Sequence, residues 1–176
     1  MVYDNASGAQ AGRAWWTLRW AGFNNVRLLD GGLKAWQAAG KPVENDPSHP
    51  PGGGSVTLSP GHMPTIEADE AAALAKDGAL LDARGKAAFI GEPGKPNTGH
   101  IPGARCAPSA TNIGPDGLFK SAEELRAGFA TLGADGSKPI GVYCGSGNAA
   151  SHAIAALHAA GLEAPLYVGS WSAWSG

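Results

Sequence analysis

The chain has only two cysteines, no run of basic residues and no long apolar stretch. Cys106 and Cys144 can form at most one disulfide, which excludes a disulfide-rich secreted scaffold. Thirteen Lys and Arg residues stand against fifteen Asp and Glu residues, and none of the basic residues cluster. Nucleic acid and membrane surfaces are therefore not expected as partners.

No apolar stretch reaches the length that spans a bilayer, and the first residues lack the charged and apolar segments of a signal peptide. We therefore expect a cytoplasmic protein with reduced thiols. Hydrophobic residues make up 43% of the sequence, which is enough for a packed core, while 27 Gly and 13 Pro predict many tight turns. A length of 176 residues fits one complete α/β domain and part of a second.

A repeated pattern occupies residues 2–36 and again residues 142–174. Each copy predicts a strand, a loop of small residues, a helix, a second strand, and a Gly turn before a short helix that bears Trp. The two copies align with about one single-residue gap. The repeat indicates two related structural units in one chain.

About a hundred residues of further α/β pattern precede the second copy, whereas nothing precedes the first. We interpret residues 1–43 as the C-terminal part of one domain, 44–54 as a linker rich in turn formers, and 55–176 as a complete second domain. A private strand–helix–strand extension is the alternative reading of the first forty residues.

The complete domain alternates short apolar strands with helices, which predicts an α/β fold with a mainly parallel sheet between two helical layers. Ser121 and Glu124 form a capping box that starts a helix ending near Gly133. The other expected helices are 68–76 and 148–160, and the expected strands are 79–82, 139–143 and 166–168.

Cys144 lies where the predicted strand 139–143 ends and before the helix that follows. Functional residues of parallel sheets gather at this edge. Gly145, Ser146 and Gly147 have little side-chain bulk, so backbone N–H groups and the positive end of the helix can stabilise a thiolate there. The alternatives are a buried structural cysteine and, for Cys106, either a resolving thiol or a small core residue.

Five segments together resemble the catalytic domain of tandem rhodaneses, and the first copy resembles the inactive domain of that family, with Asp4 where the cysteine would be. The resemblance implies a three-layer rhodanese fold, a site between two domains, and no metal or organic cofactor. The segments are residues 81–84, Phe89 with Gly91, 99–104, 142–147 and 169–174.

The resemblance also implies a sulfurtransferase that forms a persulfide on Cys144 and passes the sulfur to a thiol, a thioredoxin-like protein or cyanide. Ser146 is similar to a loop serine that assists proton movement in 3-mercaptopyruvate sulfurtransferases. Arg84 would bind the anionic end of the donor. From the residues alone, a structural ion pair between Arg84 and Asp82 is an equal alternative.

Gly145 and Ser146 stand where thiosulfate-using members carry basic residues, so the resemblance favours 3-mercaptopyruvate as donor, with thiosulfate as the alternative. Substrate binding is also expected from Lys95, the candidate substitute for a second arginine, and from the loop residues Gly145, Gly147, Asn148 and Ala149. A persulfide carrier or regulatory module with little turnover is a further alternative.

An incomplete first domain would leave apolar side chains such as Trp15 and Leu18 partly uncovered. The sequence therefore predicts a homodimer or a poorly soluble chain. A cysteine phosphatase is disfavoured, because Ala150 stands where that class needs an arginine six positions after the cysteine.

Overall fold

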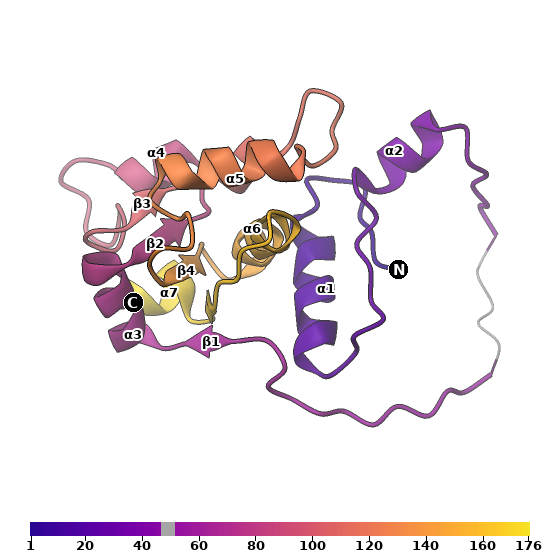
Figure 1. The fold of residues 1–176 in the computed structure, drawn as a ribbon, viewed down its shortest axis with the longest axis horizontal. Helices are drawn as coiled ribbons and strands as arrows, with labels where there is room; N and C mark the ends of the chain where they lie inside the picture. Colours follow the sequence, from indigo (N-terminus) through magenta and orange to yellow (C-terminus); the bar gives the residue numbers. More distant parts are fainter. Residues whose placement is uncertain (47–51) are drawn as a thin grey trace.

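The computed structural model describes residues 1–46 and 52–176 (Figure 1). Its centre is a five-stranded sheet in the order β1-β5-β4-β2-β3, in which every pairing is parallel. The expected parallel α/β architecture is confirmed. The strands are β1 (Thr65–Ile66), β2 (Ala79–Asp82), β3 (Arg105–Cys106), β4 (Ile140–Tyr143) and β5 (Leu166–Tyr167).

Strands β2 and β4 form the middle of the sheet, and all four residues of each are buried. They pair in register, with Leu81 opposite Val142 and Asp82 opposite Tyr143. Such strands can be apolar on both sides because a helical layer covers each face. Leu81 and Val142 therefore belong to one core cluster, whereas Tyr143 belongs to the other.

The first core cluster joins one face of the sheet to α5 (Ala122–Thr131), α6 (Asn148–Ala159) and α1 (Ala9–Trp20). The second cluster joins the opposite face to α3 (Ala68–Asp77), α4 (Lys86–Ile90) and α7 (Ser170–Trp174). A short 3-10 turn, η1 (Ser109–Asn112), follows β3. The sheet thus lies between two layers of helices, as the resemblance implied.

Local sequence determines where several helices begin. The Ser121 hydroxyl accepts from the Glu124 N–H, and the Glu124 carboxylate accepts from the Ser121 N–H, so the expected capping box is confirmed. Glu67 and Glu70 form a second box at α3, which the sequence analysis did not identify because Glu is an uncommon N-cap residue.

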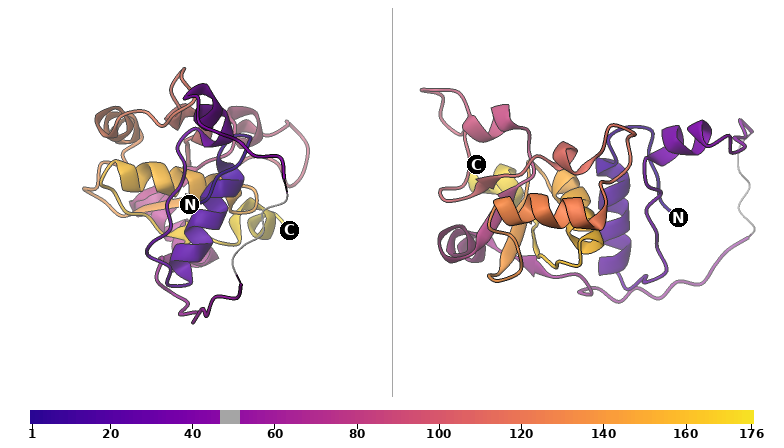
Figure 2. Two further views of the ribbon diagram at one scale, coloured as in Figure 1. Left: turned by 90° about the vertical axis from the view of Figure 1, so that its right-hand side faces the viewer. Right: turned by 45° about the horizontal axis from the view of Figure 1, so that its top comes forward.

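The first copy of the repeat has the local geometry of the second. Val2 bridges Leu28 in parallel, as Val142 bridges Leu166. In the first copy a short helix, α2 (Gly32–Ala38), follows the second extended segment, and α7 follows β5 in the same way. The two long helices of the copies, α1 and α6, lie side by side (Figures 1 and 2).

Packing of α1 on α6 overturns one expectation. Trp15 is only 5% exposed and Trp16 only 3%, and Leu18 packs against the same core cluster. The prediction is therefore wrong for Trp15, because α6 supplies the surface that covers it, whereas Leu18 is half-buried, as expected. The homodimer stays a prediction.

The segment before β1 crosses the end of α1 without forming a helix or strand. The Ser59 N–H donates to the Ala21 carbonyl and the His62 N–H donates to the Trp20 carbonyl. Of the expected linker, residues 47–51 lie outside the described part of the chain, and the remainder is exposed. Among the described residues no helix is long and apolar enough to cross a membrane.

Candidate active site

Cys144 lies immediately after β4, and its side chain is almost completely buried, with 3% of the residue exposed. Its Sγ accepts a hydrogen bond from the Gly147 N–H at 3.1 Å. Gly147 is the N-cap of α6 and has a φ of 93°, a left-handed conformation that disfavours any residue with a Cβ. The loop therefore curls around the sulfur and directs the beginning of α6 toward it.

Helix α7 fixes the backbone of Cys144 from the other side. The Trp171 N–H donates to the Cys144 carbonyl at 2.8 Å, and the Ser172 N–H donates to the Gly145 carbonyl at 3.1 Å. Both bonds tie the backbone at the nucleophile to α7. The backbone on both sides of the Cys144–Gly145 peptide is thereby held in place.

Ser170 is a buried residue that the sequence analysis missed. Its φ of 51° is left-handed, and its hydroxyl donates to the Tyr167 carbonyl and accepts a long, 3.4 Å bond from the Cys144 N–H. Strained residues of this kind persist only where the surrounding structure holds them. The repeat contained a signal, because Gly32, also left-handed, is the equivalent residue of the first copy.

The remaining residues of the loop after Cys144 differ in their exposure. Ser146 and Asn148 are exposed, whereas Gly145 and Ala149 are half-buried. The structure thus brings the predicted loop residues together around Cys144, with the Ser146 side chain facing solvent. Their roles in binding and proton transfer stay predictions.

Arg84 forms the ion pair with Asp82 that the sequence left as an alternative. Its Nε and Nη2 donate to the Asp82 carboxylate at 2.6–3.1 Å, and Nη2 also donates to the Gly99 carbonyl. Burial lowers the pKa of Arg84, but the Asp82 carboxylate outweighs that effect and raises it. The guanidinium lies 4.6 Å from the Trp171 ring, so it packs on the residue that holds the Cys144 carbonyl.

Lys95 lies in the exposed segment after α4, where it pairs with Glu92. Its side chain is 63% exposed. The contact is a surface ion pair, which contributes little to stability. Donor binding by Lys95 stays a prediction.

Cys106 is separated from Cys144 by the whole of β2. It pairs in register with Asp82, while β4 lies on the other side of β2, so the two cysteines are about 10 Å apart, beyond the span of a disulfide. Both are free thiols. Burial and the Asp82 charge raise the pKa of the Cys106 thiol, which makes it a poor nucleophile.

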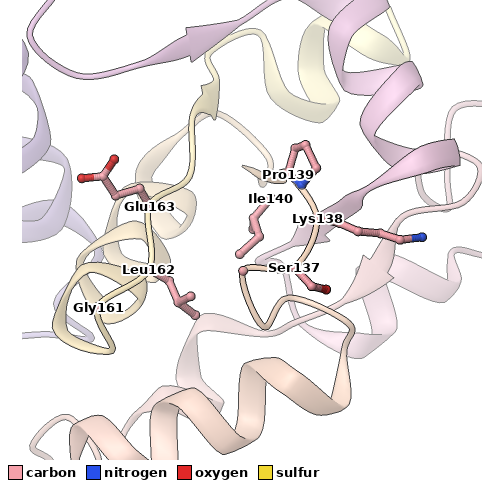
Figure 3. A pocket seen from close by; sticks show the side chains of 8 residues that line it. Ser137, Lys138, Pro139, Ile140, Gly161, Leu162 and Glu163 are labelled. Carbon is pink, nitrogen blue, oxygen red and sulfur yellow. The ribbon is translucent and has the colours of Figure 1, made fainter.

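A cavity of about 510 Å³ opens at the opposite end of β4 (Figure 3). It is lined by Ile140 at the start of the strand and by Leu162 and Glu163 beyond α6. The four-residue strand separates it from Cys144 by about 13 Å. The cavity therefore does not belong to the cysteine site.

Comparison with known proteins yields one family model, "Rhodanese-like domain", which matches residues 1–39 and 67–176. The chain is 43% identical to a "Probable 3-mercaptopyruvate sulfurtransferase" of Pseudomonas aeruginosa and 42% identical to the "Putative thiosulfate sulfurtransferase SseB" of Mycobacterium tuberculosis. Each match covers 99% of this chain but 63% of the relative.

A solved structure, that of the 3-mercaptopyruvate sulfurtransferase SseA from Escherichia coli, superimposes with a TM-score of 0.81 at 32% identity. The superposition covers 96% of this chain and 65% of SseA. The chain thus spans less than two thirds of the length of these proteins.

Proposed function

The chain belongs to the rhodanese-like domain family, and we propose that it is a sulfurtransferase carrying a sulfane sulfur as a persulfide on Cys144. One observation supports this most strongly: Sγ lies at the carboxyl end of β4 and accepts from the Gly147 N–H at the beginning of α6. Backbone N–H groups and a helix N-terminus stabilise anionic sulfur, whether it is a thiolate or a persulfide.

The reaction consists of two displacements at sulfur. In the first, the Cys144 thiolate attacks the sulfane sulfur, an S–S bond forms, and the donor's bond to that sulfur breaks, with its electron pair leaving on the donor remnant. In the second, an acceptor thiolate attacks the outer sulfur and Cys144 leaves as a thiolate. Neither step changes the total number of electrons, so no external oxidant is required.

We propose 3-mercaptopyruvate as the donor. Loss of its sulfur leaves the enolate of pyruvate, which takes up one proton. Ser146 is exposed in the loop that follows Cys144 and is proposed to carry that proton. Thiosulfate is the alternative donor, and the names of the two relatives given above include both compounds.

Arg84 is the proposed anchor for the donor's anionic end. Because Asp82 and Gly99 already occupy its Nε and Nη2, the donor would bind alongside this pair rather than replace it. The acceptor is proposed to be a thiol, a thioredoxin-like protein or cyanide. A reducing compartment such as the cytoplasm would keep both free thiols in the required state.

Intact mass spectrometry tests the proposal. The native chain and Cys144→Ser are incubated separately with 3-mercaptopyruvate and with thiosulfate. A gain of about 32 Da on the native chain alone establishes the persulfide, and the faster donor identifies the substrate class. No gain with either donor would overturn the proposed activity.

A further inference from the structure

The two copies of the repeat contact each other's loops in a reciprocal manner. In the second copy, the N-cap Gly147 faces the Arg13 guanidinium of α1, and a Cβ on Gly147 would lie 2.9 Å from Arg13 Nη1. In the first copy, the N-cap Gly8 faces the His152 ring of α6, and a Cβ there would lie 2.7 Å from Nε2. Each copy therefore places a nitrogen-bearing side chain against the other's loop.

The contact in the first copy shows what such a loop holds. Asp4 stands in the place of Cys144, and its carboxylate accepts from the N–H groups of Ala6, Gly8 and Ala11 at 2.9–3.1 Å. The same turn of small residues therefore surrounds a negative charge, and the side chain across the helix pair is the His152 imidazole, whose pKa burial lowers below its ordinary value. The corresponding charge in the second copy is the sulfur of Cys144.

Arg13 has an orphaned donor at this position. Its Nη1 is buried and finds no acceptor within residues 1–46 and 52–176, while its guanidinium lies 5.3 Å from the Trp16 ring. An unsatisfied buried donor is costly, more so on a charged group, and such an atom requires an explanation. An anion that occupies the loop only during the reaction would provide one.

The guanidinium is close enough to the sulfur for its charge to act there. Nη1 lies 2.9 Å from the Cβ position of Gly147, and the Gly147 nitrogen lies 3.1 Å from Sγ. Standard bond lengths then place Nη1 within about 9 Å of Sγ. Charges at this separation interact appreciably when they are partly shielded from water.

Building on the function proposed above, we infer that Arg13 is a positioning residue of the Cys144 loop. It packs against Gly147, whose N–H holds Sγ, and it adds positive charge where the anionic donor arrives and the persulfide forms. The first copy thus supplies the second with part of its electrostatic environment. The occupant that this charge favours is a small anion.

The test compares the alkylation of Cys144 by iodoacetate, an anion, with alkylation by neutral iodoacetamide, in the full chain. Arg13→Gln should lower the iodoacetate-to-iodoacetamide rate ratio by roughly 5-fold or more, whereas Arg13→Lys should restore it to within about 2-fold. A purely structural role would change both rates equally and leave the ratio unaltered.

Arg19→Gln is the matched control. Arg19 lies on the same helix, its guanidinium is 5.3 Å from the Trp15 ring, and its Nε is also buried without an acceptor in the described residues, so it shares the packing of Arg13 but not the contact with Gly147. Its ratio should equal that of the native chain. Equal ratios for Arg13→Gln and Arg19→Gln would overturn the inference.

Two further measurements distinguish a wrong role for Arg13 from a variant that does not fold and from a failure of the proposed function. If Arg13→Gln does not fold, Arg13→Met keeps the apolar stem over Trp16 and gives the same comparison of ratios. Persulfide formation should fall about 10-fold in the uncharged variant. Alkylation needs only the thiol, so the ratio still decides the role of Arg13 if even the native chain takes up no sulfur.

Discussion

The Asp4 loop and the Cys144 loop have similar backbones, but the side chain at the centre of each accepts a different number of hydrogen bonds from the backbone N–H groups. Asp4 accepts three backbone N–H bonds from its own loop and helix, whereas Cys144 Sγ accepts one, from Gly147. The carboxylate thereby ties its loop to the beginning of α1. The two equivalent loops therefore differ in the number of backbone bonds that the side chain at their centre accepts.

The two copies also differ where the second strand ends. Gly32 is left-handed, and a Cβ there would collide with the Asp4 carbonyl oxygen. Ser170 adopts the same left-handed backbone, carries a Cβ and reaches the Cys144 N–H. The first copy thus avoids strain with glycine, while the second retains strain beside its nucleophile.

The largest effect is expected from adding one methyl group to each N-cap glycine. Gly147→Ala should reduce persulfide formation by about 100-fold, because the left-handed N–H that holds Sγ must move. Gly8→Ala should destabilise the chain similarly, by about 1–2 kcal/mol, yet leave sulfur uptake within about 3-fold. Intact mass spectrometry measures sulfur uptake by the two variants, and denaturant unfolding measures their stability. An equal loss of sulfur uptake in both variants would contradict the proposed difference between the two loops.

Substitutions at the equivalent left-handed positions Gly32 and Ser170 should affect stability and activity separately. Gly32→Ala should lower the free energy of unfolding by about 2–4 kcal/mol, because its Cβ has no room beside Asp4. Ser170→Gly should change it by less than about 1 kcal/mol but slow persulfide formation several-fold. Urea unfolding with single-turnover kinetics tests both, and an unimpaired Ser170→Gly variant would remove Ser170 from the site.

The Asp4 carboxylate should make the stability of the first copy depend on pH. Burial raises the pKa of Asp4, but the hydrogen bonds from the N–H groups of Ala11, Ala6 and Gly8 outweigh this and leave it below its ordinary value. Asp4→Ala should cost about 1–2 kcal/mol near neutral pH, a value reduced for its partial exposure.

A lowered pKa means that this stabilisation is complete above the carboxyl's unfolded value of about 4 and is lost as pH falls through the lower folded value. The difference in unfolding free energy between the native chain and Asp4→Ala should therefore shrink only in strong acid. A difference that stays constant down to pH 2 would show that the three bonds do not depend on the charge.

The smallest effect is expected at Lys95, which belongs to neither copy. Lys95→Ala should change stability by less than about 0.5 kcal/mol, because its pair with Glu92 is exposed. If Lys95 assists donor binding, KM for 3-mercaptopyruvate should rise about 2- to 5-fold with kcat unchanged. Steady-state kinetics decide this, and an unchanged KM would eliminate Lys95 from the binding site.

Sequence patterns predicted the parts of the fold that local chemistry controls. The strands β2 and β4 are apolar runs bounded by Gly or Pro, and the Ser121 box starts α5 where expected. The two-residue strands β1 and β3 were missed because such short segments have no periodicity, and their conformation comes from pairing with β5 and β2.

The site was predictable to the same extent. Cys144 and its loop follow from a strand, small residues and a helix in succession, and this succession is local. Ser170 and Arg13 reach the loop from segments 26 and more than 130 residues away, respectively, and no local pattern records such contacts. The burial of Trp15 was missed for the same reason, because its cover is α6.

The packing of α1 on α6 also constrains the order in which the chain can fold. About 130 residues separate the end of α1 from the start of α6. At ribosomal speeds of 5–20 residues per second, roughly ten seconds pass before the partner helix is synthesised. During that interval Trp15 and Trp16 lack the α6 surface that covers them in the folded chain, so their native packing can form only late in synthesis.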